Sequence, residues 1–301
     1  MLNVYELQDA NKRRSGILLV AFVVFVGIIA WFLAKVFNYG ISTVGIALIL
    51  AGLMSFASFW WGDKIILTIS GAHPASRDKE FNFFTVVENL ALASQIPMPK
   101  LYILDDSSPY AFAAGRDPQH AIICATSGLL NKLERTELEG VVSHELSHIR
   151  NYDTRLMAIV CILVGMITLL GDWFLRGLRF GGRSRDDKGN NLDALLFIIG
   201  ILLVVLSPLI AQLIQLALFR RREFLADSSG AMLTRYPEGL ARALEKIDAD
   251  KEPLEAANKA TAHLYIANPL KNIRGQMGWF ASLFNTHPPI KERIKLLREM
   301  Q

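Results

Sequence analysis

Four long apolar runs divide the sequence into alternating hydrophobic and polar parts. They cover residues 17–36, 41–61, 157–175 and 194–219, and each approaches the roughly 20 residues that a helix needs to cross a bilayer. The polar parts between them carry helical and strand periodicities. We therefore predict a mainly α-helical protein with a small β-sheet and a four-helix transmembrane region, organised as residues 1–62, 63–156, 157–219 and 220–301.

The first two runs predict a transmembrane hairpin. Three basic residues at 12–14 precede it, and a turn at 38–40 joins its halves. The second half ends in the aromatic residues 59–61, which are typical of a membrane interface. Because basic residues gather on the cytoplasmic side of membrane proteins, we expect the N-terminus and the polar part after Lys64 to lie in the cytoplasm.

The second pair of runs, at 157–219, permits two topologies. The loop between them, at 176–193, carries five basic and three acidic residues, which favours a cytoplasmic loop and runs that lie in the interface or against protein. The length of the runs instead favours two crossings, which we prefer. The three arginines at 220–222 fit the return to the cytoplasm that two crossings require.

The remaining polar parts predict a small sheet among helices. Residues 78–94 have the period of an amphipathic helix, and short strands are expected at Leu101–Leu104, Tyr110–Ala114 and Ala121–Ala125. The residues 126–128 then open a short helix. Near the C-terminus, prolines in the first turn predict one helix at 237–247 and another from 288 onwards.

The strongest chemical signal is the pattern H-E-x-x-H, formed by His144, Glu145 and His148. A helix is expected here, opened by a capping box of Thr136 and Glu139. On a helix the two imidazoles project from the same face and can hold one zinc ion, and the glutamate between them can reach a water molecule beside it. The alternative is an ordinary amphipathic helix with two surface histidines.

Composition narrows the classes of function. Hydrophobic residues make up 52% of the 301 residues and the mean hydropathy is +0.30, which is too apolar for an ordinary soluble domain. The net charge of +4 comes with no basic stripe among aromatic residues, so we expect no nucleic-acid partner. Cys124 and Cys161 are isolated, which argues against a disulfide framework and against a cysteine-type zinc site.

A catalytic zinc site needs a third protein ligand. Glu223, shortly after the fourth apolar run, is the best candidate. Asp227 lies one turn further along the same helix face, where it can accept a hydrogen bond from a ligating imidazole. These two acids also suit an ordinary helix start in which they pair with the neighbouring arginines. Their spacing alone leaves both interpretations open.

Together, H-E-L-S-H followed by I-R-N-Y-D, E-F-L-A-D after a hydrophobic hairpin, and T-H-P-P near the C-terminus resemble the HtpX membrane metalloproteases. That family is related to the CAAX prenyl proteases within the gluzincin group. The resemblance implies a zincin-like metalloprotease domain with one Zn²⁺ per chain. It assigns the metal to His144, His148 and Glu223, the general base and acid to Glu145, and supporting roles to Asp227, Asn151 and Asp153.

The reaction we expect is peptide-bond hydrolysis. Glu145 would take a proton from the zinc-held water, which has a pKa near ~7, as that water attacks the scissile carbonyl. By resemblance His287 is the candidate donor to the oxyanion, and Arg293 would orient it or the substrate. An extended peptide in such a cleft usually pairs with an edge strand, and either Tyr110–Ala114 or Ala121–Ala125 could be that edge. The candidate substrate contacts are Ala111, Phe112 and Ala113.

The resemblance also implies substrates and a location: unfolded or damaged membrane proteins, cleaved at the cytoplasmic face of a bacterial inner membrane as quality control under stress. One alternative is a CAAX-type prenyl-protein endopeptidase, which would share the zinc chemistry but is expected to enclose a larger intramembrane chamber. Another is a non-catalytic membrane chaperone or adaptor with a structural zinc. Structural zinc sites have four protein ligands, whereas the sequence indicates three and retains Glu145 as a base.

Overall fold

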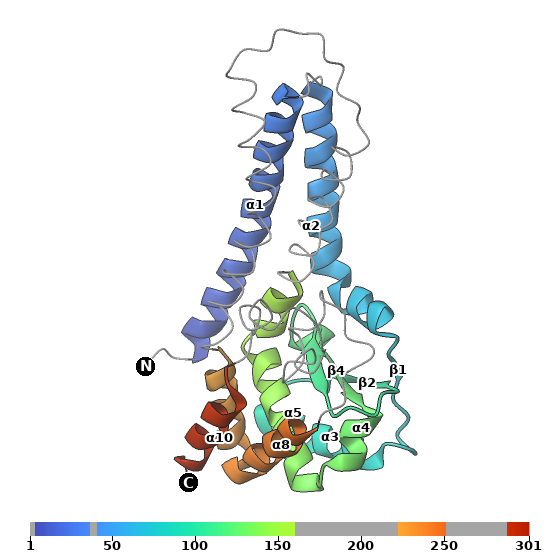
Figure 1. Cartoon of the computed structure of the whole chain (residues 1–301), viewed down its shortest axis with the longest axis vertical. Coiled ribbons are helices and arrows are strands. Elements are labelled where there is room, and N and C mark those ends of the chain that lie inside the picture. Colours follow the sequence, from blue (N-terminus) through green and yellow to red (C-terminus); the bar gives the residue numbers. More distant parts are fainter. Residues whose placement is uncertain (1–3, 37–40, 160–221, 251–287, 301) are drawn as a thin grey trace.

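The computed structural model describes residues 4–36, 41–159, 222–250 and 288–300 (Figure 1). The predicted second hydrophobic hairpin, apart from 157–159, lies outside these residues, and so does His287. Two long helices, α1 (Val4–Val36) and α2 (Ile41–Ser70), stand side by side. They rise from a more compact part that holds the sheet and the other helices (Figure 1).

Both long helices continue beyond the predicted apolar runs toward the compact part. α1 begins in the polar residues before its run, and α2 continues past a kink at Trp61, where φ is −125° and ψ is 15°. Large apolar side chains stay exposed along the pair, including Val20 (65%) and Leu53 (60%). In the described part of the chain, no helix combines the length and the apolarity expected of a membrane span, so the crossing stays a prediction.

A four-stranded mixed sheet forms one layer of the compact part, in the order β1-β2-β4-β3. The two central strands are parallel, and each edge strand is antiparallel to its neighbour. The predicted fold class of a mainly helical chain with a small sheet is thereby confirmed, and each predicted strand agrees with an observed one to within one residue. The strands are β1 (His73–Pro74), β2 (Lys100–Leu104), β3 (Ala111–Ala114) and β4 (Ile122–Thr126).

The chain reverses between β3 and β4 at Gly115, whose φ is +136°. A Cβ atom there would lie 2.5 Å from the carbonyl oxygen of His120, so only glycine fits this turn. The reversal makes β3 an edge strand and puts β4 inside the sheet. Of the two segments that the sequence offered as an open edge, the structure therefore selects the first.

α5 (Arg135–Arg150) is the central helix of the compact part. It packs against β3, α3 (Phe81–Ser94) and α8 (Pro237–Ala249), and α8 packs in turn against α10 (Ile290–Arg298). Every residue of α5 from 137 to 149 is buried except Glu139. The other described helices are α4 (Ser127–Lys132), the 3₁₀ helix η1 (Pro118–His120) and two helical stretches at 153–159 and 222–234. Polar groups on α5 thus lie inside the protein and not on its surface.

The start of α5 differs from the prediction. The capping box joins Glu134 to Glu137, whose side chain accepts a hydrogen bond from the backbone N–H of Glu134 at 2.8 Å. The predicted box of Thr136 and Glu139 was wrong by two residues. Lys246 of α8 lies 2.7 Å from the Glu137 carboxylate, so a tertiary contact favours the earlier start.

Candidate active site

His144 and His148 lie one turn apart on α5 and direct their rings toward each other. Their Nε2 atoms are 3.1 Å apart, and the ring planes cross at 89°. Both side chains are buried, with exposed fractions of 1% and 4%. Two imidazole nitrogens at this separation, shielded from water, can supply two of the four ligands of a zinc ion.

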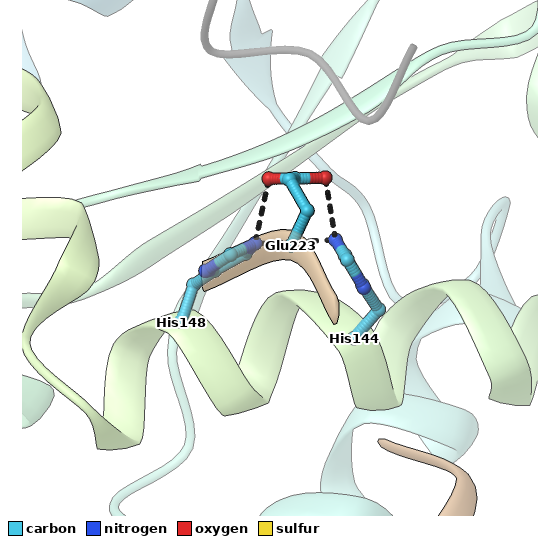
Figure 2. A group of neighbouring side chains, drawn as sticks. All are labelled: His144, His148 and Glu223. Atoms are coloured by element: carbon cyan, nitrogen blue, oxygen red, sulfur yellow. Dashed lines mark hydrogen bonds and ion pairs between the residues drawn. The ribbon is translucent and has the colours of Figure 1, made fainter. Parts of the chain in front are cut away.

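Glu223 approaches the two rings from the helical stretch 222–234 (Figure 2). Its Oε2 atom lies 3.7 Å from Nε2 of His144, and its Oε1 atom lies 3.4 Å from Nε2 of His148. One ligand atom from each of the three side chains falls within 4.8 Å of the others. The structure thus brings together the three residues for which the sequence indicated a shared metal.

Gly230 lets the helical stretch 222–234 come this close to α5. A Cβ atom at position 230 would lie 2.9 Å from Oγ of Ser143 and 3.1 Å from the backbone nitrogen of His144. Real Cβ contacts are rarely this short, so any larger residue would push the two helices apart. The absence of a side chain at position 230 therefore lets Glu223 come within range of the two histidines.

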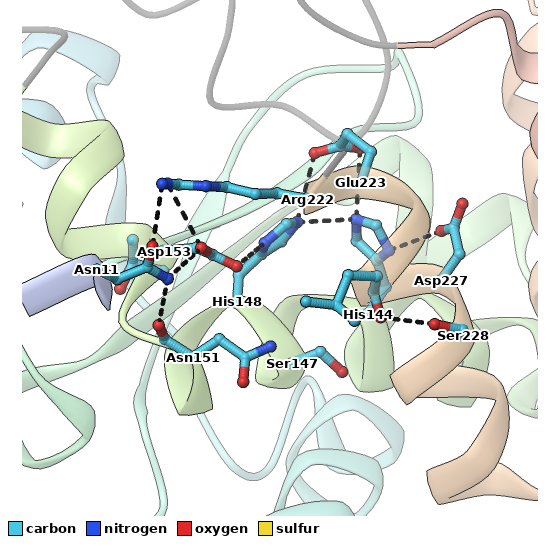
Figure 3. A network of polar contacts seen from close by, with 12 residues as sticks. Asn11, His144, Ser147, His148, Asn151, Asp153, Arg222, Glu223, Asp227 and Ser228 are labelled. Carbon is cyan, nitrogen blue, oxygen red and sulfur yellow. Dashed lines mark hydrogen bonds and ion pairs between the residues drawn. The ribbon is translucent and has the colours of Figure 1, made fainter. Parts of the chain in front are cut away.

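A carboxylate holds each imidazole from behind (Figure 3). Asp227 Oδ1 lies 2.8 Å from Nδ1 of His144, and Asp153 Oδ2 lies 3.2 Å from Nδ1 of His148. A carboxylate at Nδ1 fixes the tautomer that leaves the Nε2 lone pair free for a metal. The predicted supporting residues Asp227 and Asp153 therefore have the contacts that such a role requires.

Arg293 of α10 is completely buried and binds two of these carboxylates. Its Nε and Nη2 atoms donate to the two oxygens of Asp227 at 2.8 and 2.7 Å, and its Nη1 atom lies 3.2 Å from Oε2 of Glu223. The sequence suggested that Arg293 orients His287 or the substrate. Its described contacts instead join it to the candidate metal ligands, and its predicted role toward substrate stays untested.

Two further residues of this network were not predicted. Arg222 donates to Oδ1 of Asn11 at 3.0 Å, and Asn11 donates to Asp153 Oδ1 at 2.9 Å and to the backbone oxygen of Asn151 at 2.7 Å (Figure 3). In the sequence, Arg222 stands out only as part of a basic cluster. Its position next to the candidate ligand Glu223 could have indicated that it belongs to the site. No local pattern marks Asn11, which lies in α1.

The charges of the site fit a divalent cation. With neutral imidazoles, four buried carboxylates and two buried guanidinium groups leave two negative charges around the histidine pair, counting the described residues only. Two nitrogens and one carboxylate oxygen are the donor set of many catalytic zinc sites. The carboxylates belong to Glu145, Asp153, Glu223 and Asp227, and the guanidinium groups to Arg222 and Arg293.

Glu145 is buried beside the histidines, where it accepts a hydrogen bond from the backbone N–H of Ala113. Burial raises the pKa of its carboxyl to about 7, and the charge of Glu223 acts in the same direction, against that of His148. The side chains of Ala111, Phe112 and Ala113 are themselves buried, so β3 presents backbone groups at this edge. The candidate base therefore lies directly beside the candidate substrate strand.

The pKa values of the two histidines shift in opposite directions. Burial lowers the pKa of His144 despite its hydrogen bond to Asp227. Burial alone would also lower that of His148, but the carboxylates of Asp153 and Glu223 outweigh it and raise the pKa to about 10. The two carboxylates thus favour a positive charge at His148, which a bound metal ion would supply.

Residues 78–301 match the description of peptidase family M48. The chain belongs to this family. The matched segment contains α3, the whole sheet except β1, and every member of the site apart from Asn11. The chain is accordingly a metalloprotease, and its histidine–glutamate cluster is the candidate metal site.

The M48 chain matches relatives over nearly its whole length. It is 42% identical to a protein named Protease HtpX homolog from Caldanaerobacter subterraneus subsp. tengcongensis, covering 99% of this chain and 98% of that one. A protein of the same name from Dictyoglomus thermophilum is 41% identical, covering 98% and 94%. Among solved structures, S. mikatae Ste24p aligns with a TM-score of 0.48 and 17% identity, over 96% of this chain and 66% of that one.

Proposed function

We propose that this M48 protein is a zinc endopeptidase that cleaves unfolded or damaged membrane proteins at the cytoplasmic face of a bacterial inner membrane. The observation that carries the proposal is the convergence of His144, His148 and Glu223 beside a buried glutamate and the edge strand β3. Bound there, zinc would supply a Lewis acid that polarises the scissile carbonyl and acidifies water.

Glu145 performs the proton transfers in this mechanism. Its carboxylate takes a proton from the attacking water and returns it to the amide nitrogen as the peptide bond breaks. The hydrogen bond from Ala113 fixes the carboxylate beside the strand that holds the substrate. His287 is proposed, on the resemblance alone, to donate a hydrogen bond to the tetrahedral oxyanion.

The edge strand β3 supplies the substrate contacts in this proposal. The backbone N–H of Thr126 donates to the backbone oxygen of Tyr110, and the Tyr110 N–H donates to the Thr126 hydroxyl. The antiparallel register then makes 112 and 114 the next positions bonded to β4. The backbone groups of Ala111 and Ala113 therefore point away from β4. The N–H of Ala113 binds Glu145, and the other groups on this side are the ones proposed to bind the substrate. A peptide that adds to this edge is bound through its main chain, which predicts broad sequence specificity.

The long helices support a membrane location. Exposed apolar side chains line both α1 and α2, which is expected where lipid and not water surrounds them. Lys12, Arg13 and Arg14 near the start of α1 orient that end toward the cytoplasm. The catalytic part lies at the same end of α1, so its substrates would be membrane proteins with unfolded cytoplasmic segments (Figure 1).

The deciding experiment compares wild-type protein with Glu145→Gln, both purified in detergent and loaded with zinc. We expect the wild type to cleave an unfolded membrane protein and the variant to lose at least about 100-fold in rate, because general base catalysis contributes about 10²–10⁴-fold. Zinc content, measured in the same samples, should be unchanged. Cleavage by both proteins at equal rates would overturn the role of Glu145.

The same assay separates the alternatives. A prenylated peptide cleaved in preference to the unfolded protein would identify a CAAX-type endopeptidase. Zinc bound without cleavage of either substrate would identify a structural metal in an adaptor, which the three-ligand site and the buried Glu145 argue against.

A further inference from the structure

A cavity of about 580 Å³ lies at the kink of α2, where the helix meets the sheet. Aromatic side chains and cations line it, and none of its lining residues belongs to the metal site. The residues that matter here are Phe56, Trp60, Trp61, Lys64, Lys100 and Arg116. We call this space the kink cavity.

One wall of the kink cavity is cationic. Lys64 comes from α2, Lys100 begins β2, and Arg116 follows β3, so three separate segments contribute a positive charge. Asp63 is the only carboxylate in the described lining. Among the described residues neither lysine forms an ion pair, whereas Arg116 lies 3.4 Å from Asp117, which His120 also contacts at 2.7 Å. The cavity therefore favours an anion.

An aromatic ring of the lining fixes Arg116. The guanidinium lies over the ring of Trp60, 4.4 Å from its centre, and donates to the backbone oxygen of the same residue at 3.4 Å. Trp60 and Trp61 are 42% and 48% exposed, as expected of tryptophans at a membrane interface. Because Arg116 occupies the face of Trp60, that ring is not available to bind a choline cation.

An apolar track leads along α2 into the kink cavity. Its members are separated by four, three and four residues, which places them on one face of the helix. The last two also line the cavity, so the track and the cationic wall form one continuous surface. The track consists of Ile49 (64% exposed), Leu53 (60%), Phe56 (53%) and Trp60 (42%).

We propose that the kink cavity binds the headgroup of an anionic phospholipid. The phosphate faces Lys64, Lys100 and Arg116, and an acyl chain follows the apolar track. This inference rests on the proposed membrane location of α1 and α2, and it names the lipid class that holds the catalytic part against the bilayer. Free phosphate would use the cations alone, whereas a lipid uses both halves of the surface.

The test titrates delipidated full-length protein in detergent with dioctanoyl phosphatidylglycerol, dioctanoyl phosphatidylcholine or inorganic phosphate, and counts bound lipid by native mass spectrometry. The double variant Lys64→Gln/Lys100→Gln removes two of the cations. Lys291→Gln/Lys295→Gln removes the same charge from α10, which contributes no residue to the cavity and lies apart from α2 in Figure 1. Leu53→Asn interrupts the track.

We expect saturable binding of phosphatidylglycerol, weakened about 30-fold in the cavity double variant and unchanged in the α10 variant. Leu53→Asn should weaken lipid binding and leave any phosphate binding unaltered. Equal affinity for phosphatidylcholine, displacement of the lipid by millimolar phosphate, or full binding by the cavity variant would each overturn the proposal.

Vesicle flotation in the same series separates this inference from the proposed function. Protein that floats with both phosphatidylcholine and phosphatidylglycerol vesicles, without preferring the latter in the titration, would overturn the lipid site alone. Protein that floats with neither would overturn the membrane location as well. Cleavage by the wild type and its loss in Glu145→Gln are measured in detergent, so they test the protease independently of both.

Discussion

At the scale of single residues, Arg293 is a buried cation that joins two carboxylates of the candidate site. A completely buried guanidinium is costly to desolvate, and only paired carboxylates in good geometry compensate for it. Asp227 accepts two hydrogen bonds from Arg293, and Glu223 supplies a second negative charge at 3.2 Å. Burial alone would raise the pKa of Asp227, yet Arg293 and His144 lower it below its usual value. Arg293 thus keeps Asp227 ionised where His144 needs an acceptor.

Replacing Arg293 by methionine should destabilise the protein by about 3–5 kcal/mol, because two buried carboxylates lose their cation. The matched control is Arg298→Met on the same helix, where the side chain is exposed and pairs with Glu238 and Glu245 at the surface. The apparent Tm of both variants is measured in detergent with excess chelator, so that zinc does not mask the difference. Equal Tm values for the two variants would contradict the central position assigned to Arg293.

At the scale of elements, local patterns located the helices and strands but not their contacts. The H-E-x-x-H helix and three strands follow from periodicity, which depends on neighbouring residues alone. The capping box was misplaced because two glutamates, Glu137 and Glu139, both have suitable spacing, and Lys246 from a distant helix decides between them. Sheet order likewise depends on pairings that no local spacing encodes. The role of Gly230 could not be predicted from local sequence either, because only the packed structure shows that it contacts Ser143 and His144.

Gly230→Val should therefore weaken metal binding more than it alters the helix that carries it. The added side chain meets Ser143 and the backbone of His144, which forces the helical stretch 222–234 outward and withdraws Glu223. Overpacking of this kind costs about 1–3 kcal/mol. Chelator competition measures the zinc affinity, and Gly52→Val, where the new Cβ meets nothing within 4 Å, controls for valine in a helix. Unchanged zinc affinity in Gly230→Val would show that Glu223 is not held by this packing.

At the scale of the whole molecule, the metal site is assembled from distant parts of the chain, and one of them is the N-terminal helix. Asn11 of α1 lies 142 residues from Asp153 and 211 from Arg222, yet it joins both in one buried network. Lys12 adds a second contact, with its ammonium 4.5 Å from the centre of the Tyr152 ring. Tyr152 has a φ of +59°, a conformation that non-glycine residues adopt only when their surroundings hold them there. The helix proposed to enter the membrane is thus docked on the turn that follows the second histidine.

Asn11→Leu should lower zinc affinity although Asn11 touches neither the ion nor a ligand. Leucine removes the hydrogen bonds to Asp153 and Arg222, so the carboxylate behind His148 loses a partner, and changes at this distance from a metal typically cost about 10–100-fold in affinity. Ser15→Ala is the matched control, because Ser15 is equally buried one turn along α1 and its hydroxyl donates to Asn11 of the same helix. Zinc affinity comes from chelator competition, and the apparent Tm of zinc-free protein shows whether α1 has merely come loose. A fall in zinc affinity with an unchanged zinc-free Tm would mean that the first helix positions His148. Equal zinc affinities in both variants would mean that α1 has no role in positioning His148.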